Sequence, residues 1–254
     1  MSRAKKNLIA DLLEEKVPYY SALSSSNKEE FLKRVILYEG IMFYKGNNGF
    51  VCTQEVRTII ASGFVQLTFG FDNYLSRYFS KIHVTPIPYR HKDFNCDLLG
   101  HVDYPKRLIK LSWKDVLQGY ELEDDGLNVV FHEMSHALEF EHRRWLKLYL
   151  NFRDFNFFFN LIAFFLKKRF CFFDEAGYQL WLSWARKDIC KMRVNERHYL
   201  RQYAAKNIHE YLACALEEFF ERGQEMKRVN SPLYNQLMFL LNQDPLNKSN
   251  PRLI

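Results

Sequence analysis

Cysteine is scarce in this sequence, and its arrangement excludes two common uses. The 254 residues hold five cysteines, which is an odd number, and no two of them form a CxxC pair. A disulfide framework needs paired cysteines, and a cysteine zinc cluster needs closely spaced ones. We therefore expect a reducing compartment and predict a cytoplasmic location.

Long hydrophobic runs are also missing. The most apolar stretch, Phe155 to Leu166, is well short of the roughly 20 residues that a spanning helix needs. The apolar run near the amino terminus breaks off too soon for a signal-peptide core. We interpret the stretch as a buried helix. The alternative is an apolar surface that touches a partner or a membrane, because the segment up to Phe173 holds more aromatic residues than one helix stripe requires.

Neither sign of charge dominates the chain. Its 36 basic and 30 acidic residues leave a net charge of +6, spread along the sequence, which gives little reason to propose a nucleic-acid partner. With 48% hydrophobic residues, a chain of this length can bury one substantial core. We expect a single domain over residues 1–254.

The most informative segment that is present runs from His132 through Glu133 to His136. On an α-helix, four residues turn about 400° and rise about 6 Å, so the two histidines point the same way and can share one metal ion. Glu133 then lies about 100° away, beside the metal. That position suits a general base acting on a metal-bound water, as in the HExxH hydrolases. The competing interpretation is an ordinary surface histidine pair.

The residues around this motif favour a helix. Asp124 or Asp125 can cap it, and apolar residues recur at helical spacing, at Leu127, Val130, Phe131, Met134 and Leu138. A helix that buries such a stripe leaves the histidines in or near the core, where unpaired imidazoles are costly. This disfavours the surface-pair interpretation.

Elsewhere the patterns predict two helices and two strands. The helices are Glu29 to Tyr44 and Thr53 to Phe69, and the strands are Ile82 to Thr85 and Leu108 to Trp113. The second strand precedes the motif helix. We hypothesise that it borders the cleft and offers an unpaired edge to an extended peptide.

A catalytic zinc usually has three protein ligands, so the third must be found outside the motif. His142 has the spacing of a third histidine, but Glu139 stands where such enzymes use glycine to leave the helix. If the helix continues, His142 faces about 240° away from His136. A second candidate is Glu210, in a predicted helix from Asn207 to Glu221.

The role of Glu210 has an ordinary alternative. Asn207 and Glu210 have the spacing of a capping box, in which the glutamate serves only its own helix. Glu217, two turns further on, is the third candidate ligand. It could equally hold another ligand in place.

Four segments resemble the Mlc titration factor A family of zinc-dependent peptidases, in the form found in Bacteroidota. They are FVQLTFGFDNYL at 64–75, LIKLSWKDVLQGYELEDDGLNVVFHEMSHALEFE at 108–141, YAAKNIHEYLACALEEFFER at 203–222 and SPLYNQLMFLLNQDPL at 231–246. Their common order is more specific than HExxH alone. The Phe-rich stretch from Phe155 to Phe173 departs from the more polar pattern of the family.

The resemblance implies an α+β, mainly helical, zincin-like metallopeptidase with a small sheet beside the HExxH helix, distantly similar to the anthrax lethal factor catalytic domain. It implies one Zn²⁺ per chain on His132, His136 and Glu210, with Glu133 as the base. It also implies peptide or protein substrates and some aminopeptidase character. Separately from the resemblance, we allow for a regulatory protein partner. Within the domain we expect an N-terminal helical part at 1–50, a catalytic core at 51–246 and a flexible tail at 247–254.

The expected reaction is hydrolysis of a peptide bond by a zinc-activated water, with Glu133 taking a proton and passing one to the leaving amine. Tyr203 is our candidate donor to the scissile carbonyl oxygen; its alternative is a packed aromatic residue. A second hypothesis is a zinc-containing regulatory or binding protein that contacts a partner through its Phe-rich surface with little catalysis.

Overall fold

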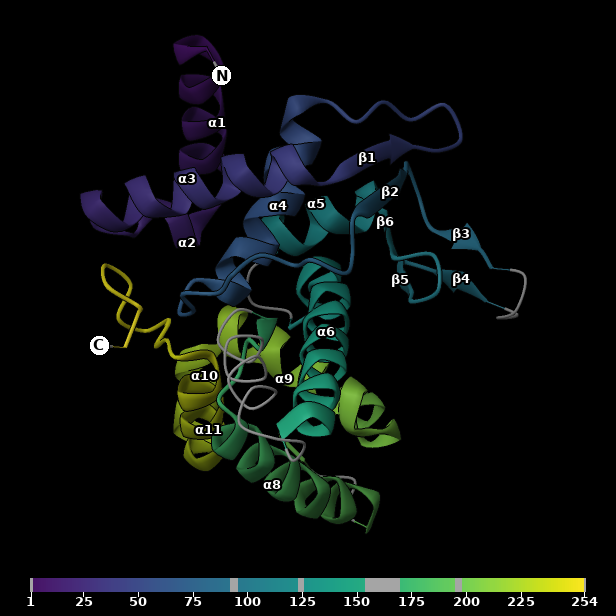
Figure 1. Ribbon diagram of the computed structural model, residues 1–254, viewed down its shortest axis with the longest axis vertical. Coiled ribbons are helices and arrows are strands. Elements are labelled where there is room, and N and C mark those ends of the chain that lie inside the picture. The colour runs from purple at the N-terminus through teal and green to yellow at the C-terminus, as the bar shows by residue number, and fades with distance from the viewer. Residues whose placement is uncertain (1, 92–95, 123–125, 154–169, 195–197, 254) are drawn as a thin grey trace.

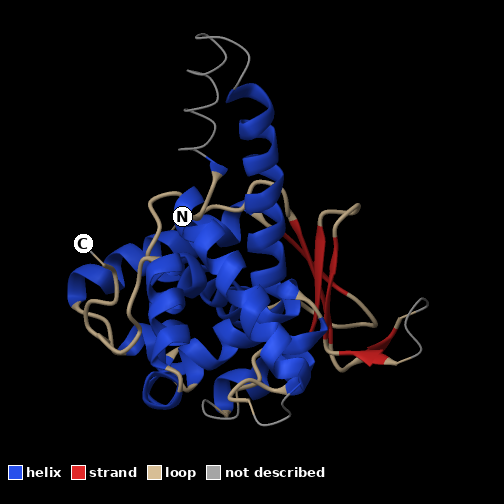
Figure 2. Cartoon of the chain, turned by 90° about the horizontal axis from the view of Figure 1, so that it is seen from below, coloured by secondary structure: helices blue, strands red, loops and turns tan. Residues whose placement is uncertain are grey.

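Helices build most of the protein, and a small mixed sheet lies on one flank (Figure 2). The computed structural model describes residues 2–91, 96–122, 126–153, 170–194 and 198–253. This architecture confirms the expected α+β, mainly helical class and is consistent with a zincin-like metallopeptidase fold. Among the described residues, no helix is both long and apolar enough to cross a bilayer.

The amino-terminal part of the chain contains four helices, of which the last is buried. These are α1 (Arg3–Lys16), α2 (Pro18–Ser21), α3 (Ser25–Ile41) and α4 (Gln54–Thr68). Thr53 caps α4 by accepting a hydrogen bond from the Val56 amide at 3.3 Å. Nearly every side chain of α4 is buried, because α1 and α3 pack on one side and the motif helix on the other. The predicted helices over 29–44 and 53–69 correspond to α3 and α4.

The main sheet has the order β1-β2-β6-β5. Its strands are β1 (Phe43–Gly46), β2 (Lys81–Thr85), β6 (Leu108–Ser112) and β5 (Gly100–Asp103), and a separate two-stranded ribbon joins β3 (Tyr89–Arg90) to β4 (Asp97–Leu98). The first three strands run parallel, and β5 is antiparallel to β6. Both predicted strands are present.

One expectation about the sheet is wrong. The strand at Leu108–Ser112 lies inside the sheet, hydrogen-bonded to β2 on one side and β5 on the other, so it has no free edge. Within the described part of the chain, β1 and β5 are the two edge strands, and β5 packs against the motif helix. The sequence signal for β5 is weak because the strand is only four residues long and begins with glycine.

The remaining elements among the described residues are helices (Figure 1). Its elements are α5 (Trp113–Glu121), α6 (Val129–Arg153), α8 (Glu175–Val194), the 3₁₀ turn η1 (Gln202–Lys206), α9 (Ile208–Glu221), α10 (Gly223–Val229) and α11 (Ser231–Leu241). The helix α6 carries the motif and runs through the middle of the view, while α9 packs alongside it. The predicted helix over 207–221 is α9, with Asn207 as its cap.

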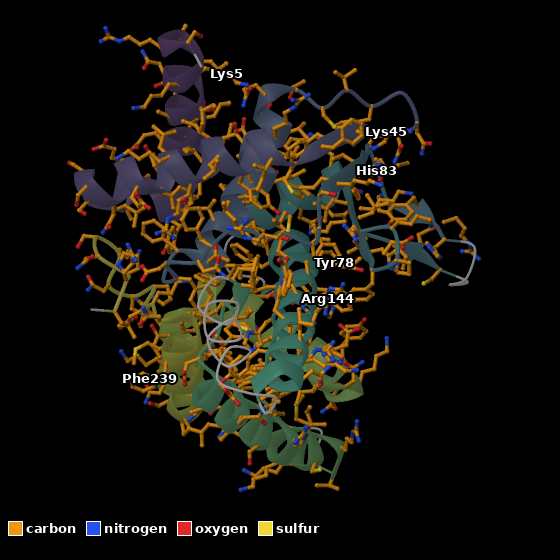
Figure 3. All side chains as sticks on the ribbon, in the orientation of Figure 1. Lys5, Lys45, Tyr78, His83, Arg144 and Phe239 are labelled. Atoms are coloured by element: carbon orange, nitrogen blue, oxygen red, sulfur yellow. The ribbon has the colours of Figure 1, made fainter. Side chains whose placement is uncertain are left out.

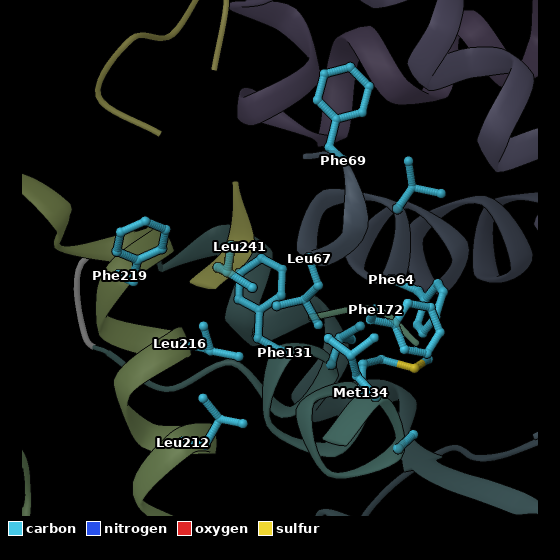
Figure 4. Close-up of a cluster of buried hydrophobic side chains, with 14 of the residues drawn as sticks. Phe64, Leu67, Phe69, Phe131, Met134, Phe172, Leu212, Leu216, Phe219 and Leu241 are labelled. Carbon is cyan, nitrogen blue, oxygen red and sulfur yellow. The ribbon is translucent and has the colours of Figure 1, made fainter. Parts of the chain in front are cut away.

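One hydrophobic cluster joins these helices. Figure 4 shows Phe64 and Leu67 of α4 facing Phe131 and Met134 of α6, and the same cluster continues to Phe219 of α9. Close packing has local requirements: a Cβ on Gly63 would come within 2.4 Å of the Val130 side chain, so α4 can approach α6 only with glycine there. The core therefore fixes α6 against both α4 and α9.

The carboxy-terminal segment, where we expected a flexible tail, is hydrogen-bonded to the amino-terminal half. The Ser24 amide donates to the Ser249 carbonyl at 2.9 Å, and Arg252 lies 3.0 Å from the Asp72 carboxylate. The backbone of Leu253 also bonds back to Asn242. Charge and backbone pairing thus tie residues 249–253 to the helices beside them.

Candidate metal centre

The motif helix begins at a tight cap. The side-chain oxygen of Asn128 accepts hydrogen bonds from the amides of Val130 and Phe131 at 3.1 and 3.2 Å, which satisfies the first turn of α6. The predicted caps, Asp124 and Asp125, lie outside the described residues. Leu127 precedes the helix and is 50% exposed, so its place in the apolar stripe was wrong.

The apolar stripe otherwise orients α6 as its spacing predicts. Val130, Phe131, Met134 and Leu138 are buried in the core, while His132 and His136 are only partly buried on another side of the helix. Their Nε2 atoms lie 3.3 Å apart. The two imidazoles thus converge on one point.

Glu210 reaches the same point from α9. Its Oε2 lies 3.1 Å from the Nε2 of His132 and 3.3 Å from the Nε2 of His136. Asn207 caps α9 by accepting hydrogen bonds from the amides of His209 and Glu210. The asparagine half of the proposed capping box is therefore present, but the Glu210 carboxylate faces the histidines of α6.

The spacing of these three donors suits a zinc ion. A tetrahedral site with zinc–ligand bonds of about 2.0–2.1 Å has donor–donor edges of about 3.3 Å. The three measured edges are 3.1, 3.3 and 3.3 Å. Two imidazoles and one carboxylate are also a donor set that catalytic zinc sites use, with a fourth position left for water or substrate.

His132 belongs to a second possible donor group, with Cys214 and Glu217. That group is already occupied by a cation of the protein itself, because the Arg201 guanidinium lies 2.6 Å from Glu217 Oε2. Burial, with Glu217 nearby, raises the pKa of the Cys214 thiol to about 12, so it stays protonated near neutral pH. A metal there would have to displace Arg201 and a proton.

Glu217 instead orients a ligand. Its Oε2 lies 3.3 Å from the Nδ1 of His132, and its Oε1 accepts a hydrogen bond from the Asn128 amide at 3.1 Å. A carboxylate on Nδ1 fixes the ring and leaves Nε2 free to face the metal. Neither Asn128 nor Arg201 carries a sequence signal for this role, since both act through backbone and side-chain contacts formed only on folding.

The protonation of the three converging groups is strongly coupled. Burial works to lower the pKa of His132, but hydrogen bonds to Glu210 and Glu217 outweigh it and raise that pKa to about 10. Burial works in the opposite direction on Glu210, yet its contacts with His132 and His136 hold its pKa well below the usual range. The carboxylates of Glu210 and Glu217 thus create a negative potential at the point where a metal cation would bind.

Glu133 lies beside these donors and is only 7% exposed. Burial raises the pKa of its carboxyl, against the opposing effect of His132 and His136. Its side chain packs on the edge strand, where a Cβ on Gly100 would come within 2.5 Å of the Glu133 Cγ. Glycine at the start of β5 therefore makes room for this glutamate.

Tyr203 also reaches the centre. It lies in η1 and is 48% exposed, and its hydroxyl donates to Glu210 Oε1 at 3.1 Å. Burial, together with the Glu210 carboxylate, raises the pKa of its hydroxyl, which keeps that group protonated and able to donate.

His142 lies elsewhere, as continuation of the helix predicts. It is fully buried further along α6, its ring packs on Phe173 and Tyr178, and its Nδ1 accepts a hydrogen bond from the Phe173 amide at 3.3 Å. Glu139 pairs with Nδ1 of His209 at 2.5 Å. That contact ties α6 to α9 at the residue next to Glu210.

Comparison with known proteins identifies the family. The sequence pattern of the family described as Glucose-regulated metallo-peptidase M90 matches residues 2–145 and 173–240. The chain belongs to the M90 metallopeptidase family. This confirms the family expected from the four segments, and it supports metal binding and metallopeptidase activity.

The M90 match and one relative together cover most of the chain. An uncharacterized protein of Synechocystis sp. is 24% identical over 262 residues, covering 92% of this chain and 83% of that protein. The internal gap in the M90 match, 146–172, contains most of the Phe155–Phe173 stretch. Residues 155–169 of that stretch lie outside the described residues, so their predicted burial stays a prediction, whereas Phe172 and Phe173 are buried.

Proposed function

We propose that this M90 protein hydrolyses peptide bonds with one zinc ion held by His132, His136 and Glu210. The observation that carries the proposal is the triangle of donors, with edges of 3.1–3.3 Å, that two separate helices bring together beside a buried glutamate. The match of these edges to tetrahedral zinc favours that metal over ions that prefer six oxygen ligands.

Bound zinc would supply a Lewis acid that polarises the scissile carbonyl and makes a water molecule more acidic. Glu133 would take a proton from that water and pass one to the leaving amine. Its buried surroundings suit both tasks, since a raised pKa lets the carboxyl hold the proton between the two transfers. Glu217 and Arg201 would keep His132 in the orientation that the site requires.

Tyr203 remains our candidate donor to the carbonyl oxygen. Its protonated hydroxyl donates a hydrogen bond to Glu210, one of the three converging donors, and the residue is half exposed. To act on substrate, the hydroxyl would exchange its hydrogen bond with Glu210 for one to the carbonyl oxygen.

The substrate would lie along β5. This strand pairs with β6 on one side only among the described residues, and its first residue contacts Glu133. An extended peptide that adds to such an edge gains main-chain hydrogen bonds whatever its sequence. The edge role that we first gave to residues 108–113 therefore passes to residues 100–103. The aminopeptidase-like preference, the cytoplasmic location, the domain boundaries and the likeness to lethal factor stay predictions.

The test combines metal analysis with cleavage of short unblocked peptides by the wild type and Glu133→Gln. We expect one zinc per chain in both proteins and cleavage by the wild type alone, because the amide cannot accept the proton. Cleavage unaffected by the substitution would remove this mechanism. Bound zinc with no cleavage by either protein would favour the alternative, a zinc-containing protein whose task is to bind a partner.

A further inference from the structure

Four basic side chains stand in one row across the main sheet. The register pairs Lys45 of β1 with His83 of β2, His83 with Lys110 of β6, and Lys110 with His101 of β5. Residues in register on neighbouring strands point to the same face of a sheet. The row therefore crosses the sheet from its β1 edge to the strand beside the metal centre.

This row lies on the outer face, away from the helices. On three of the strands a direct sequence neighbour of the row residue is buried in the core: Ile82 beside His83, Ile109 beside Lys110 and Val102 beside His101. Successive side chains on a strand point to opposite faces, so the row residues point away from the core. Figures 2 and 3 agree: the helices lie on one side of the sheet, and the labelled Lys45 and His83 stand on the sheet flank of the molecule. We call this outer surface, with its row of four, the basic sheet face.

Little negative charge balances it. The four strands of the main sheet contain one acidic residue, Asp103, and its carboxylate already bonds Lys106 at 2.6 Å. Lys81 adds a further positive charge on the outward side of β2. Burial, helped by Lys45 and Lys110, lowers the pKa of His83, as expected where positive charge is concentrated.

Apolar side chains flank the row. Phe43 is 61% exposed on the outward side of β1, and Leu99, just before β5, is 49% exposed. The Lys110 ammonium sits 3.4 Å from the centroid of the Tyr89 ring. The exposed Phe43 and Leu99, near the two ends of the row, suit a polypeptide that carries both acidic and apolar side chains better than they suit a phosphate backbone.

We propose that the basic sheet face binds an acidic segment of the polypeptide substrate, which is held there while the neighbouring segment lies along β5. The part of this inference that concerns cleavage rests on the proposed peptidase function. Neighbouring strands are about 4.8 Å apart, so the row spans about 14 Å, the length of an extended segment of four to five residues. A peptide paired with β5 presents alternate side chains to this face, beside His101.

Binding can be measured without catalysis. The probe is a fluorescein-labelled peptide of ten alternating glutamate and leucine residues, followed by fluorescence anisotropy on the Glu133→Gln protein. The variant Lys45→Glu/Lys81→Glu reverses two exposed charges of the face. Its control, Lys5→Glu/Lys227→Glu, reverses two exposed charges on α1 and α10 and changes the net charge equally.

We expect the probe to bind at least tenfold more weakly to the face variant and within twofold of the parent to the control. Raising the salt from 0.05 to 0.5 M should weaken binding to the parent at least tenfold, because the contacting charges are exposed. An NMR titration should show the pKa of His83 rising when the peptide binds. A peptide with glutamine in place of glutamate should bind at least tenfold more weakly to the parent.

Equal binding of the glutamate and glutamine peptides, or equal losses in the face variant and the control, would overturn the proposal. So would displacement of the probe by an oligothymidylate but not by oligoglutamate, since the face would then select a nucleic acid. If the probe binds as expected but no peptide is cleaved by the wild type, the face stands and the peptidase function fails. Cleavage of neutral peptides without binding of the probe would support the peptidase function and overturn the proposed role of the basic sheet face.

Discussion

At the scale of single residues, two glutamates of α9 stand on opposite sides of one histidine and have different expected roles. Glu210 faces the Nε2 of His132, on the side that it shares with His136, whereas Glu217 faces Nδ1 and is neutralised by Arg201. The first position is that of a metal ligand and the second that of a residue that orients one. Sequence alone could not separate them, since both lie on one side of the same predicted helix.

Substitution of each glutamate should separate these roles. Glu210→Ala should lose stoichiometric zinc, because only two protein donors remain. Glu217→Gln should keep zinc but bind it about 10–100-fold more weakly, as loss of an orienting partner does. Glu225→Ala, on the exposed side of α10, is the control and should match the wild type. Metal analysis after dialysis and a competition titration with a chelator give both quantities; full zinc in Glu210→Ala would contradict the assignment.

The pairing of His132 also predicts how zinc binding depends on pH. Its pKa of about 10 means that the metal-free protein holds this imidazole protonated at pH 7, whereas a ligand must be deprotonated at Nε2. Zinc binding should therefore release about one proton from His132, and the apparent affinity should rise about tenfold per pH unit between pH 6 and 8. Calorimetry in buffers of different ionisation enthalpy measures the released protons. A pH-independent affinity would show that His132 is neutral before the metal binds.

At the scale of elements, the edge strand and the motif helix meet through one glycine. A Cβ on Gly100 would lie 2.7 Å from Glu133 Oε1, so any larger residue must displace the proposed base. Gly100→Ala should keep zinc, since no metal donor moves directly, but lower kcat/KM by about 100-fold, because misplacement by about 1 Å costs that much. Peptide cleavage and metal content measured on one preparation test this.

Another glycine gives the matched control. Gly40 lies in the last turn of α3 with nothing within 4 Å of a Cβ, so Gly40→Ala should leave activity unchanged and stabilise the protein by about 0.5 kcal/mol. Loss of zinc in Gly100→Ala would mean that β5 supports the metal ligands as well as Glu133.

Elements with long, regular patterns could be predicted from sequence, and those defined by tertiary contacts could not. The helices α3, α4 and α9 and the strands β2 and β6 lie within a few residues of their predicted ranges. The strand order could not be predicted from the sequence, because β5 pairs with β6 through main-chain atoms and no local sequence pattern specifies which strand is the partner. The same holds for Arg201, which precedes a 3₁₀ turn and reaches Glu217 only in the folded chain.

At the scale of the whole molecule, the start of α3 and the carboxy-terminal segment lie together, far from the metal centre in sequence but joined to it by one core. The hydrophobic cluster runs from Ile9 of α1 through α4 and α6 to Leu241 of α11. The donors on α6 and α9 are held by this shared packing, since each helix contributes one apolar side to it. The site therefore depends on the fold as a whole, whereas its chemistry depends on a few residues.

The carboxy-terminal segment allows a test of whether the stability of the fold can be lowered without changing the chemistry of the site. Deletion of residues 247–254 removes the hydrogen bond from Ser24 to Ser249 and the backbone bonds of Pro251 and Leu253 to residues 244 and 242. It also removes the ion pair of Arg252 with Asp72, which is partly exposed and contributes little. We expect a loss of about 1–2 kcal/mol, seen as a Tm lower by about 2–8 °C, with zinc content and kcat/KM unchanged at 25 °C. Asp72→Asn, which removes only the exposed ion pair, should lower Tm by less than half as much. An unchanged Tm after the deletion would show that the segment is a free tail in solution, and a loss of zinc would show that the ends of the chain support α9 directly.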